Sequence, residues 1–370
     1  MRCDIFIAGG GPAGLASAIA LRQRGADVVV ADALRPPIDK ACGEGLMPDA
    51  RRDLGRLGIS LDSAAGAEFT GIAFADSESR VAAEFPRGVG IGVRRPVLHK
   101  LLVDRAAELG VRMLWNTSVV LNGGAAVTLG GEACGYRWMI GADGHASRVR
   151  AWAGLERGRL RSRRFGFRVH YRVAPWSAHV EVHWGPLGQA YITPVGPQEI
   201  CVSTMTRHSG VRGSQMIESI PFLCDKLAGA ETTTAERGSL TLTRRLHRVT
   251  RGNVALVGDA SGSADAITGE GLAMSFRQAL LLAESLEEGS LEGYESRHKG
   301  ILALPQRMAG LMLLMDRSPR LRRRALAAMA VRPELFRGLL AVHVGEQPLP
   351  RFVLRHGAQL GARVCLPGIL

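Results

Sequence analysis

The sequence predicts an α/β fold: a discontinuous Rossmann-like domain, an inserted and mostly antiparallel β-sheet, and a helical C-terminal region. Three patterns support this prediction. The chain opens with a strand, a glycine-rich turn, a helix and a second strand; it then changes to short alternating strands; and it later returns to α/β character. We therefore expect one domain from residues 1–158 and 246–292, a sheet domain from residues 159–245, and helices in residues 293–370.

The first pattern lies at the start of the chain. Residues 5–7 form an apolar run typical of a buried strand, and residues 28–30 form a second one. Between them, residues 15–24 have helical periodicity that ends at Gly25. The turn before this helix has the G-x-G-x-x-G spacing and consists of Gly9, Gly11, Pro12, Ala13 and Gly14.

Each glycine of this fingerprint has its own mechanical role. Gly9 allows the tight turn, Gly11 lets the backbone approach a pyrophosphate, and Gly14 lets the helix pack closely on the strand. The helix N-terminus presents free N–H groups and a partial positive charge to the phosphates. Asp32 follows the second strand, where a carboxylate accepts hydrogen bonds from ribose hydroxyls. The pattern predicts a dinucleotide site and leaves NAD and FAD open.

The chain is strongly basic. It has 47 Lys and Arg residues against 34 Asp and Glu residues, a formal net charge of +13 and an isoelectric point near 10.3. Arginines cluster in residues 159–168 and 317–324, but no zinc-finger, RRM-like or helix-turn-helix pattern accompanies them. We expect solvated basic faces and no nucleic-acid partner, and a peripheral contact with an anionic membrane surface stays open.

Hydropathy and cysteine usage point to a soluble protein. The mean hydropathy is +0.06, and no apolar run approaches the roughly 18 to 20 residues of a membrane span. Because the nucleotide fingerprint starts at residue 3, we expect no signal peptide and a cytoplasmic location. The six cysteines lack C-x-x-C spacing and are interpreted as free thiols. No His, Cys or carboxylate cluster has metal-ligand spacing, so we expect no metal.

Two further motifs bear on the cofactor. Asp143-Gly144 follows a predicted strand in MIGADGHASRVR, and Gly258-Asp259 follows another in VALVGDASG. With these DG and GD motifs added to the glycine fingerprint, roughly residues 3–290 resemble the FAD-dependent oxidoreductase superfamily of aromatic hydroxylases, flavin-dependent halogenases and geranylgeranyl reductases. The resemblance implies FAD as the cofactor and NAD(P)H as a transient electron donor.

The resemblance also implies residue roles around FAD. Asp259 would hydrogen-bond the ribityl chain, and Asp32 would hold the adenosine ribose. Arg95 matches an arginine that precedes a helix and lies along the cofactor, and Arg94 is its close competitor. The two motifs add their other members to the cofactor-binding set, Asp143 and Gly258.

The loop DAITGEGLA leads into a predicted helix whose N-terminus would face the flavin ring. Gly269 and Gly271 would let the backbone approach the ring, and the helix dipole would stabilise the reduced, anionic flavin. Glu270 and Cys42 are the candidate catalytic residues, and Cys42 and Gly43 are also candidate cofactor contacts. Three interpretations of Cys42 stay open: a structural residue, a thiol that contacts flavin or substrate, or a covalent flavin link.

The motifs leave two reactions open. Aromatic hydroxylases usually carry P-x-x-G-Q-G where this chain has AITGEG, which weakens that assignment. Geranylgeranyl reductases share ACGEG and TGEG, but their Y-x-W-x-F-P signature is reduced here to QAYITP. The halogenase signature W-x-W-x-I-P is absent from the sequence.

We favour an NAD(P)H-driven monooxygenase that hydroxylates an apolar aromatic or polyketide-like small molecule through a flavin C4a-hydroperoxide, in secondary metabolism. The alternative is a geranylgeranyl-reductase-like enzyme that reduces C=C bonds of an isoprenoid-like substrate. A flavin-binding protein without turnover is the non-catalytic rival.

The substrate is not specified, but the inserted strands that should face it are apolar and aromatic. The candidate substrate-binding residues are Phe167, His183, Tyr191, Thr193 and Pro194. In the C-terminal region, Met and Leu residues over 308–315 precede an arginine cluster. This stretch either packs over the flavin domain or covers the substrate entrance and touches a membrane or hydrophobic carrier. The oligomeric state is not predicted.

Overall fold

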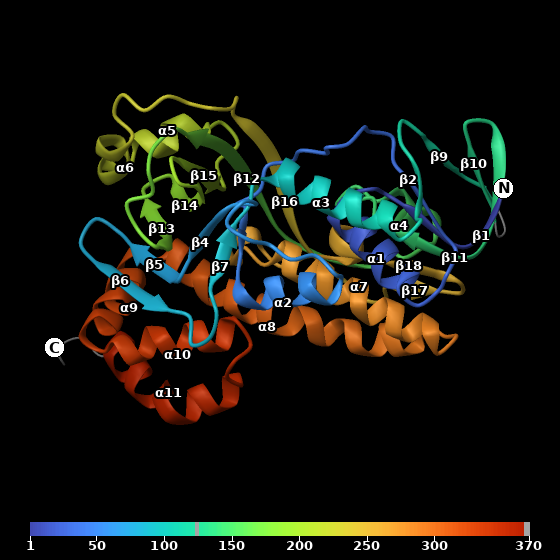
Figure 1. Ribbon diagram of the computed structural model, residues 1–370. Helices are drawn as coiled ribbons and strands as arrows, with labels where there is room; N and C mark the ends of the chain where they lie inside the picture. The colour runs from blue at the N-terminus through green and yellow to red at the C-terminus, as the bar shows by residue number, and fades with distance from the viewer. Residues whose placement is uncertain (123–125, 366–370) are drawn as a thin grey trace.

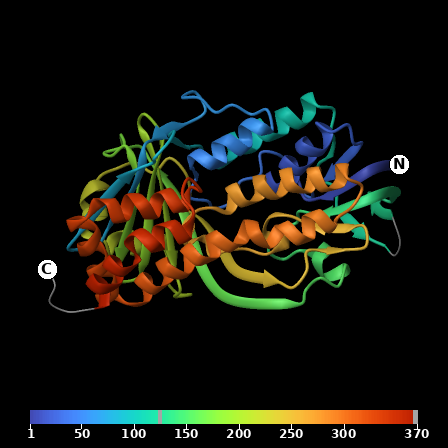
Figure 2. The same ribbon diagram turned by 90° about the horizontal axis from the view of Figure 1, so that it is seen from below.

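The computed structural model describes residues 1–122 and 126–365 and contains two large sheets side by side (Figure 1). The N-terminus lies at the end of the first sheet that points away from the second sheet, and the C-terminal helices pack beneath the second sheet. The long helix α8 (Glu292–Arg317) runs along both parts, as the view from below shows (Figure 2). The mixed α/β architecture with a helical C-terminal region confirms the predicted fold class.

The first sheet has eight strands, and its main path is β17-β18-β11-β1-β2-β8. β1 pairs in parallel with both β2 and β11, and its last four residues are all buried, as expected for a strand covered on both faces. The strands are β1 (Arg2–Ala8), β2 (Val28–Ala31), β8 (Arg112–Leu114), β9 (Val119–Leu121), β10 (Ala126–Leu129), β11 (Glu132–Gly141), β17 (Thr250–Arg251) and β18 (Val254–Leu256).

Three helices of the first domain have a proline in their first turn. This residue lacks the N–H that would be unsatisfied there, and its fixed φ suits the helix. α1 (Pro12–Arg22), α2 (Pro48–Arg56) and α3 (Arg95–Glu108) all follow this rule. α1 packs against α3 and α7 (Gly271–Glu287). The short α4 (Arg148–Trp152) follows β11.

The second sheet has seven strands in the order β16-β12-β15-β14-β13-β5-β6, and all its pairings are antiparallel except β13 with β5. Its members are β5 (Gly71–Ala75), β6 (Arg80–Glu84), β12 (Gly158–Tyr171), β13 (His179–Gly185), β14 (Gly188–Gly196), β15 (Glu199–Thr206) and β16 (Arg237–Leu246). β5 and β6 come from the stretch 1–158, so the sheet extends beyond the predicted range 159–245. The pairing of β5 with β13 joins strands that are distant in the sequence, so no local sequence pattern predicts it.

A third, three-stranded sheet joins the two. It consists of β3 (Gly45–Leu46), β4 (Ala67–Phe69) and β7 (Gly90–Gly92), in the order β3-β7-β4. Gly92 has no room for a side chain, because a Cβ there would lie 1.8 Å from the carbonyl oxygen of Pro194. This close approach packs the small sheet directly against β14.

Helices cover the two faces of the second sheet differently. On one face, Ile192 and Val202 pack with Ile217 and Leu223 of the short helices α5 (Gly213–Glu218) and α6 (Pro221–Lys226). On the other face, Val182 and other strand residues share a core with the C-terminal helices. Besides α8, these helices are α9 (Pro319–Val331) and α10 (Pro333–His343). The last helix, α11 (Leu349–Cys365), packs on α9 and α10.

The described cysteines are free: Cys3, Cys42, Cys134, Cys201 and Cys224. The side chain of Cys365 lies outside the described residues, as do residues 366–370 of the predicted helical region. Nowhere in the described ranges is a helix long and apolar enough to cross a membrane.

Candidate functional site

A cavity of about 720 Å³ lies between the two sheets and the C-terminal helices. At one end, its wall is formed by the glycine turn before α1 and by the carboxyl end of β2. At the other end, its wall is formed by strands of the second sheet and by α8, α9 and α10. Because the two ends belong to one cavity, a group bound at the glycine turn and a molecule held by the helices would share the same space.

The glycine turn combines two sterically required glycines with one open position. A Cβ on Gly9, which has φ of +112°, would lie 2.4 Å from the carbonyl oxygen of Ala142, and a Cβ on Gly14 would lie 1.9 Å from that of Gly9. A Cβ on Gly11 would meet nothing within 4 Å. Gly11 also lines the cavity, and no side chain caps α1. The turn thus leaves space at the helix N-terminus where a pyrophosphate fits.

Asp32 and Arg95 line the cavity at the positions that the sequence predicted. Asp32 accepts a hydrogen bond from the N–H of Gly10 at 2.7 Å, which fixes its carboxylate beside the glycine turn. The Nε atoms of Arg95 and Arg94 are both buried without a hydrogen-bond partner, so the cavity lining distinguishes the two residues. Arg94 instead lies 3.6 Å from Glu199 and does not line the cavity, so the geometry favours Arg95 over its competitor.

The DG motif has a structural task. Asp143 accepts hydrogen bonds from the N–H groups of Arg148 and Val149 and from the hydroxyl of Ser147. Its carboxylate therefore caps α4 and holds the turn after β11, while the residue itself lines the cavity.

The GD motif lies in the short 3₁₀ helix η1 (Gly258–Ser261) after β18. Gly258 has φ of +58°, and a Cβ there would lie 2.6 Å from that of Ala13, so this glycine lets η1 pack against the start of α1. Asp259 lines the cavity and faces Lys40 Nζ at 3.3 Å and His145 Nε2 at 3.2 Å. Burial lowers the pKa of His145, and the Asp259 carboxylate opposes this shift.

The loop after the GD motif forms η2 (Ala266–Thr268) and leads into α7. Gly269, in the left-handed conformation, ends η2, and Gly271 begins α7. Both line the cavity, and a Cβ on either would meet nothing within 4 Å. Tyr191 supports this loop because its hydroxyl donates a hydrogen bond to the carbonyl oxygen of Ile267 at 2.9 Å.

The segment Cys42–Glu44 also lines the cavity. Its backbone is tied to the second sheet, since Thr193 donates to the carbonyl of Gly43 at 2.8 Å and Ser203 to that of Cys42 at 3.0 Å. The thiol of Cys42 lines the cavity and accepts a hydrogen bond from the N–H of Glu44 at 3.4 Å.

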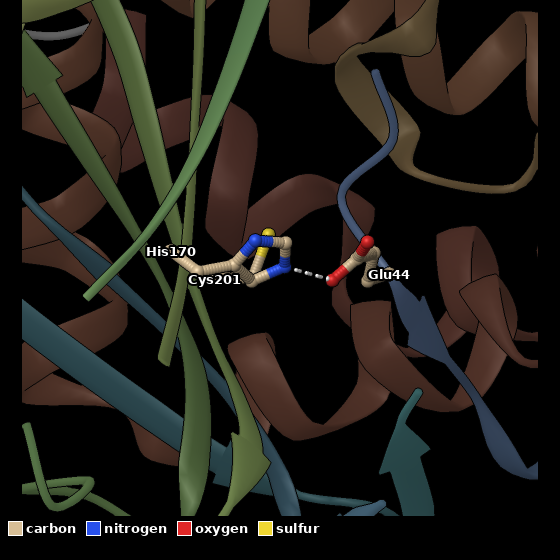
Figure 3. A group of neighbouring side chains, drawn as sticks. All are labelled: Glu44, His170 and Cys201. Atoms are coloured by element: carbon tan, nitrogen blue, oxygen red, sulfur yellow. Dashed lines mark hydrogen bonds and ion pairs between the residues drawn. The ribbon is translucent and has the colours of Figure 1, made fainter. Parts of the chain in front are cut away.

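Glu44, His170 and Cys201 form a buried cluster behind this segment, with ligand atoms within 4.8 Å of one another (Figure 3). The Glu44 carboxylate in this cluster already has hydrogen-bond partners within the protein. Glu44 bonds His170 Nε2 at 2.6 Å, the guanidinium of Arg168 at 3.1 Å and the N–H of Arg95 at 2.9 Å. Burial also raises the pKa of the Cys201 thiol well above its usual range. A carboxylate that is already paired with a buried arginine is a poor ligand for a metal cation. The cluster therefore fixes the Cys42–Glu44 segment against the second sheet.

The other end of the cavity is apolar. The C-terminal helices contribute Met308, Leu311, Met312, Met315, Met329, Phe336, Leu339, Leu340 and His343 to its wall. Flexible methionine side chains adapt to irregular apolar shapes. This end suits a hydrocarbon chain or an apolar ring system.

The structure brings most predicted site residues to the cavity. Those that line it are Gly9, Gly11, Pro12, Ala13, Asp32, Cys42, Gly43, Arg95, Asp143, Phe167, Tyr191, Thr193, Asp259, Gly269 and Gly271. Those that do not are Gly14, His183, Pro194, Gly258 and Glu270. The geometry above gives Gly14 and Gly258 packing roles at the start of α1.

His183 and Pro194 face away from the cavity because side chains alternate along a strand. On β13, Val180 and Val182 line the cavity, so His183 points to the opposite face. There its ring stacks on Phe222 with centroids 5.0 Å apart, and its Nε2 bonds Glu181 at 2.9 Å.

Glu270 lies just behind the wall, next to a residue that the sequence did not indicate. Its side chain is 1% exposed, and its Oε2 lies 3.6 Å from Nδ1 of His343, which lines the cavity from α10. Neither of these two atoms has a hydrogen-bond partner. A lone histidine in a C-terminal helix carries no sequence signal of function, so only the fold reveals this pair.

The fold and the site together define a flavoprotein whose cofactor cradle opens into an apolar cavity. A family model described as "FAD binding domain" matches residues 2–298, and the chain belongs to this family. It is a member of the predicted superfamily of FAD-dependent oxidoreductases, whose reductases, halogenases and hydroxylases all occur among the similar proteins.

Individual relatives are distant. Menaquinone reductase of Mycolicibacterium smegmatis is 28% identical over 328 residues, which cover 80% of this chain and 79% of that protein. Digeranylgeranylglycerophospholipid reductase of Methanocella arvoryzae is 24% identical over 291 residues, covering 73% of each.

Solved structures share the fold. A flavoprotein/dehydrogenase from Cytophaga hutchinsonii superposes with a TM-score of 0.83 at 17% identity and covers 98% of both chains. A mutant of 2-methyl-3-hydroxypyridine-5-carboxylic acid oxygenase superposes with a TM-score of 0.69 at 26% identity, covering 84% of this chain and 90% of that one.

Proposed function

We propose that the protein is an FAD-dependent reductase that saturates a carbon–carbon double bond in an apolar, isoprenoid-like substrate, with NAD(P)H as the electron donor. The observation that carries the proposal is the single cavity that joins the cofactor cradle to an end lined with Met, Leu and Phe side chains. A substrate with a long apolar part would bury its surface there, with little polar recognition to satisfy.

The curated relatives support reduction over hydroxylation. From the sequence we favoured hydroxylation although the motifs left both reactions open, but menaquinone reductase and digeranylgeranylglycerophospholipid reductase resemble this chain over 80% and 73% of its length. The Cys42 thiol on the cavity wall agrees with the ACGEG segment that geranylgeranyl reductases share. Because of these two observations, we now favour double-bond reduction over hydroxylation.

Bound FAD would supply the hydride for this reaction. The protein's own residues would bind FAD and orient it. Gly11 and the N-terminus of α1 leave space for the pyrophosphate, Asp32 and Asp259 face the cavity as acceptors for hydroxyl groups, and Gly269 and Gly271 leave the backbone accessible. The methionine-rich wall excludes water from the reacting double bond.

Hydroxylation remains the second candidate because of one observation. The oxygenase structure is 26% identical and aligns with 84% of this chain. The apolar cavity would equally shield a hydroxylation from water.

One anaerobic experiment separates the two reactions. The FAD-loaded protein is mixed with NADPH or NADH and with menaquinone bearing an unsaturated isoprenoid side chain or, separately, with geranylgeraniol. Double-bond reduction adds two hydrogens to the isoprenoid chain without oxygen, and mass spectrometry of the chain fragments distinguishes this gain from reduction of the quinone ring. Anaerobic inactivity combined with substrate-stimulated oxygen uptake in air would replace the reductase by the hydroxylase.

A further inference from the structure

The wall that the C-terminal helices contribute to the cavity contains one polar side chain. Eight of the nine lining residues from α8, α9 and α10 are Met, Leu or Phe, and the ninth is His343. All nine lie beyond residue 298, where the family match ends. A titratable ring in an otherwise apolar wall needs an explanation, since burying it without a partner is costly.

The atoms around His343 supply part of that explanation. Its Nδ1 faces Glu270 Oε2 at 3.6 Å, longer than a hydrogen bond, and both atoms are buried without a hydrogen-bond partner. Because Nδ1 is directed at the carboxylate, Nε2 is the nitrogen left for the cavity. A buried polar pair that stays unsatisfied calls for a functional reason more often than a satisfied one does.

The charges around Glu270 come from three elements. Besides burial, the negative charge of Asp49 on α2 raises the pKa of Glu270, and the positive charge of Arg277 on α7 lowers it. His343 approaches Glu270 from α10. Burial raises the pKa of Glu270, and the positive charges of His343 and Arg277 partly offset this shift. The carboxylate is therefore placed to compensate a positive charge on the imidazole when His343 carries a proton.

We propose that His343 is the catalytic proton donor of this enzyme and that Glu270 is its positioning residue. The inference rests on the proposed double-bond reduction. In that reaction the π bond breaks, one carbon receives the hydride, and the other receives a proton from His343 Nε2. Two C–H bonds form, the alkene is reduced by two electrons, and the imidazole regains its proton from water afterwards. Glu270, predicted from the sequence as catalytic, acts through His343 because it does not reach the cavity.

The first arm of the test needs no substrate. Imidazole NMR of the FAD-loaded protein records the ring signals of His343, which are assigned by their loss in His343→Asn. In Glu270→Gln, we expect these signals to move, because the carboxylate beside Nδ1 is removed. Unchanged signals would show that the two groups do not act as a pair.

The second arm measures the proton step. The enzyme is reduced with one equivalent of dithionite without oxygen, and the rate of flavin reoxidation is recorded after adding menaquinol with an unsaturated isoprenoid side chain, whose ring is already reduced and cannot accept the electrons. We expect His343→Asn to slow reoxidation by about 10²–10⁴-fold with flavin content unchanged, and Glu270→Gln to shift its pH profile. His208→Asn, at an exposed loop position, is the matched control and should react like the wild type.

The outcomes distinguish the two proposals. A wild-type enzyme that does not reoxidise with this probe or with geranylgeraniol overturns the reductase function and the donor role with it. A reactive wild type with an equally fast His343→Asn variant overturns only the donor role.

Discussion

Replacing Gly11 by valine separates cofactor binding from folding. Gly11 has φ of −73° and ψ of 179°, an extended conformation that valine adopts, and a Cβ there meets nothing within 4 Å. Without FAD, the variant should lose no more than about 1 kcal/mol, the usual cost of a poorer residue at a helix N-cap. With FAD, the valine side chain would occupy the space at the start of α1 that the pyrophosphate needs.

The expected size follows from binding linkage. At an FAD concentration of about 100 times the wild-type Kd, the wild type gains about 2.7 kcal/mol of stability. A variant that binds 100-fold more weakly gains only about 0.4 kcal/mol under the same conditions. Denaturant unfolding with and without FAD should therefore show a loss of about 2.3 kcal/mol in the FAD-dependent part.

Gly14→Ala is the contrasting control. Its Cβ would lie 1.9 Å from the carbonyl oxygen of Gly9, so it should destabilise the protein by about 1–3 kcal/mol even without FAD. If Gly11→Val folds and keeps the wild-type FAD affinity, the pyrophosphate does not lie at this turn.

Three further predictions concern other parts of the molecule. Asp259→Ala should weaken FAD binding by about 1–3 kcal/mol, measured by flavin fluorescence, because polar partners lose their acceptor; an unchanged affinity refutes the ribityl assignment. Burial lowers the pKa of His298 to about 4. Since the unfolded chain then binds the proton more readily, the free energy of unfolding should fall by about 2–3 kcal/mol between pH 7.5 and 4.5, and His298→Gln should flatten this slope. Leu311 and Leu314 are 38% and 53% exposed near the arginine cluster; salt-sensitive co-sedimentation with anionic but not neutral vesicles would support a membrane contact, and its absence would leave α8 as a packing helix.

The sequence was most informative where chemistry and local geometry coincide. The glycine turn was readable because steric limits leave no residue but glycine at Gly9 and Gly14, and the two aspartate motifs were readable because each follows a strand. The role of Asp143 could not be predicted even from its motif. An aspartate that caps α4 and an aspartate that binds a cofactor have the same sequence pattern.

Non-local geometry accounts for what the sequence did not show. Short alternating strands predicted the second sheet, but which face of β13 meets the cavity depends on register, and His183 lies on the opposite face. The parallel pairing of β5 with β13 has no local signal. The contact of His343 with Glu270 joins helices α10 and α7, so no spacing in the chain encodes it.

The position of β1 in the middle of its sheet affects how the protein is made. β1 is synthesised well before one of its neighbours, because β11 begins only at Glu132, and β18 pairs with β11 later still. At about 5–20 residues per second, β1 waits on the order of 6–25 s on the ribosome before β11 exists. During that time an apolar strand edge stays unpaired, so we expect the nascent chain to depend on chaperones and to acquire its cofactor only after synthesis is nearly complete.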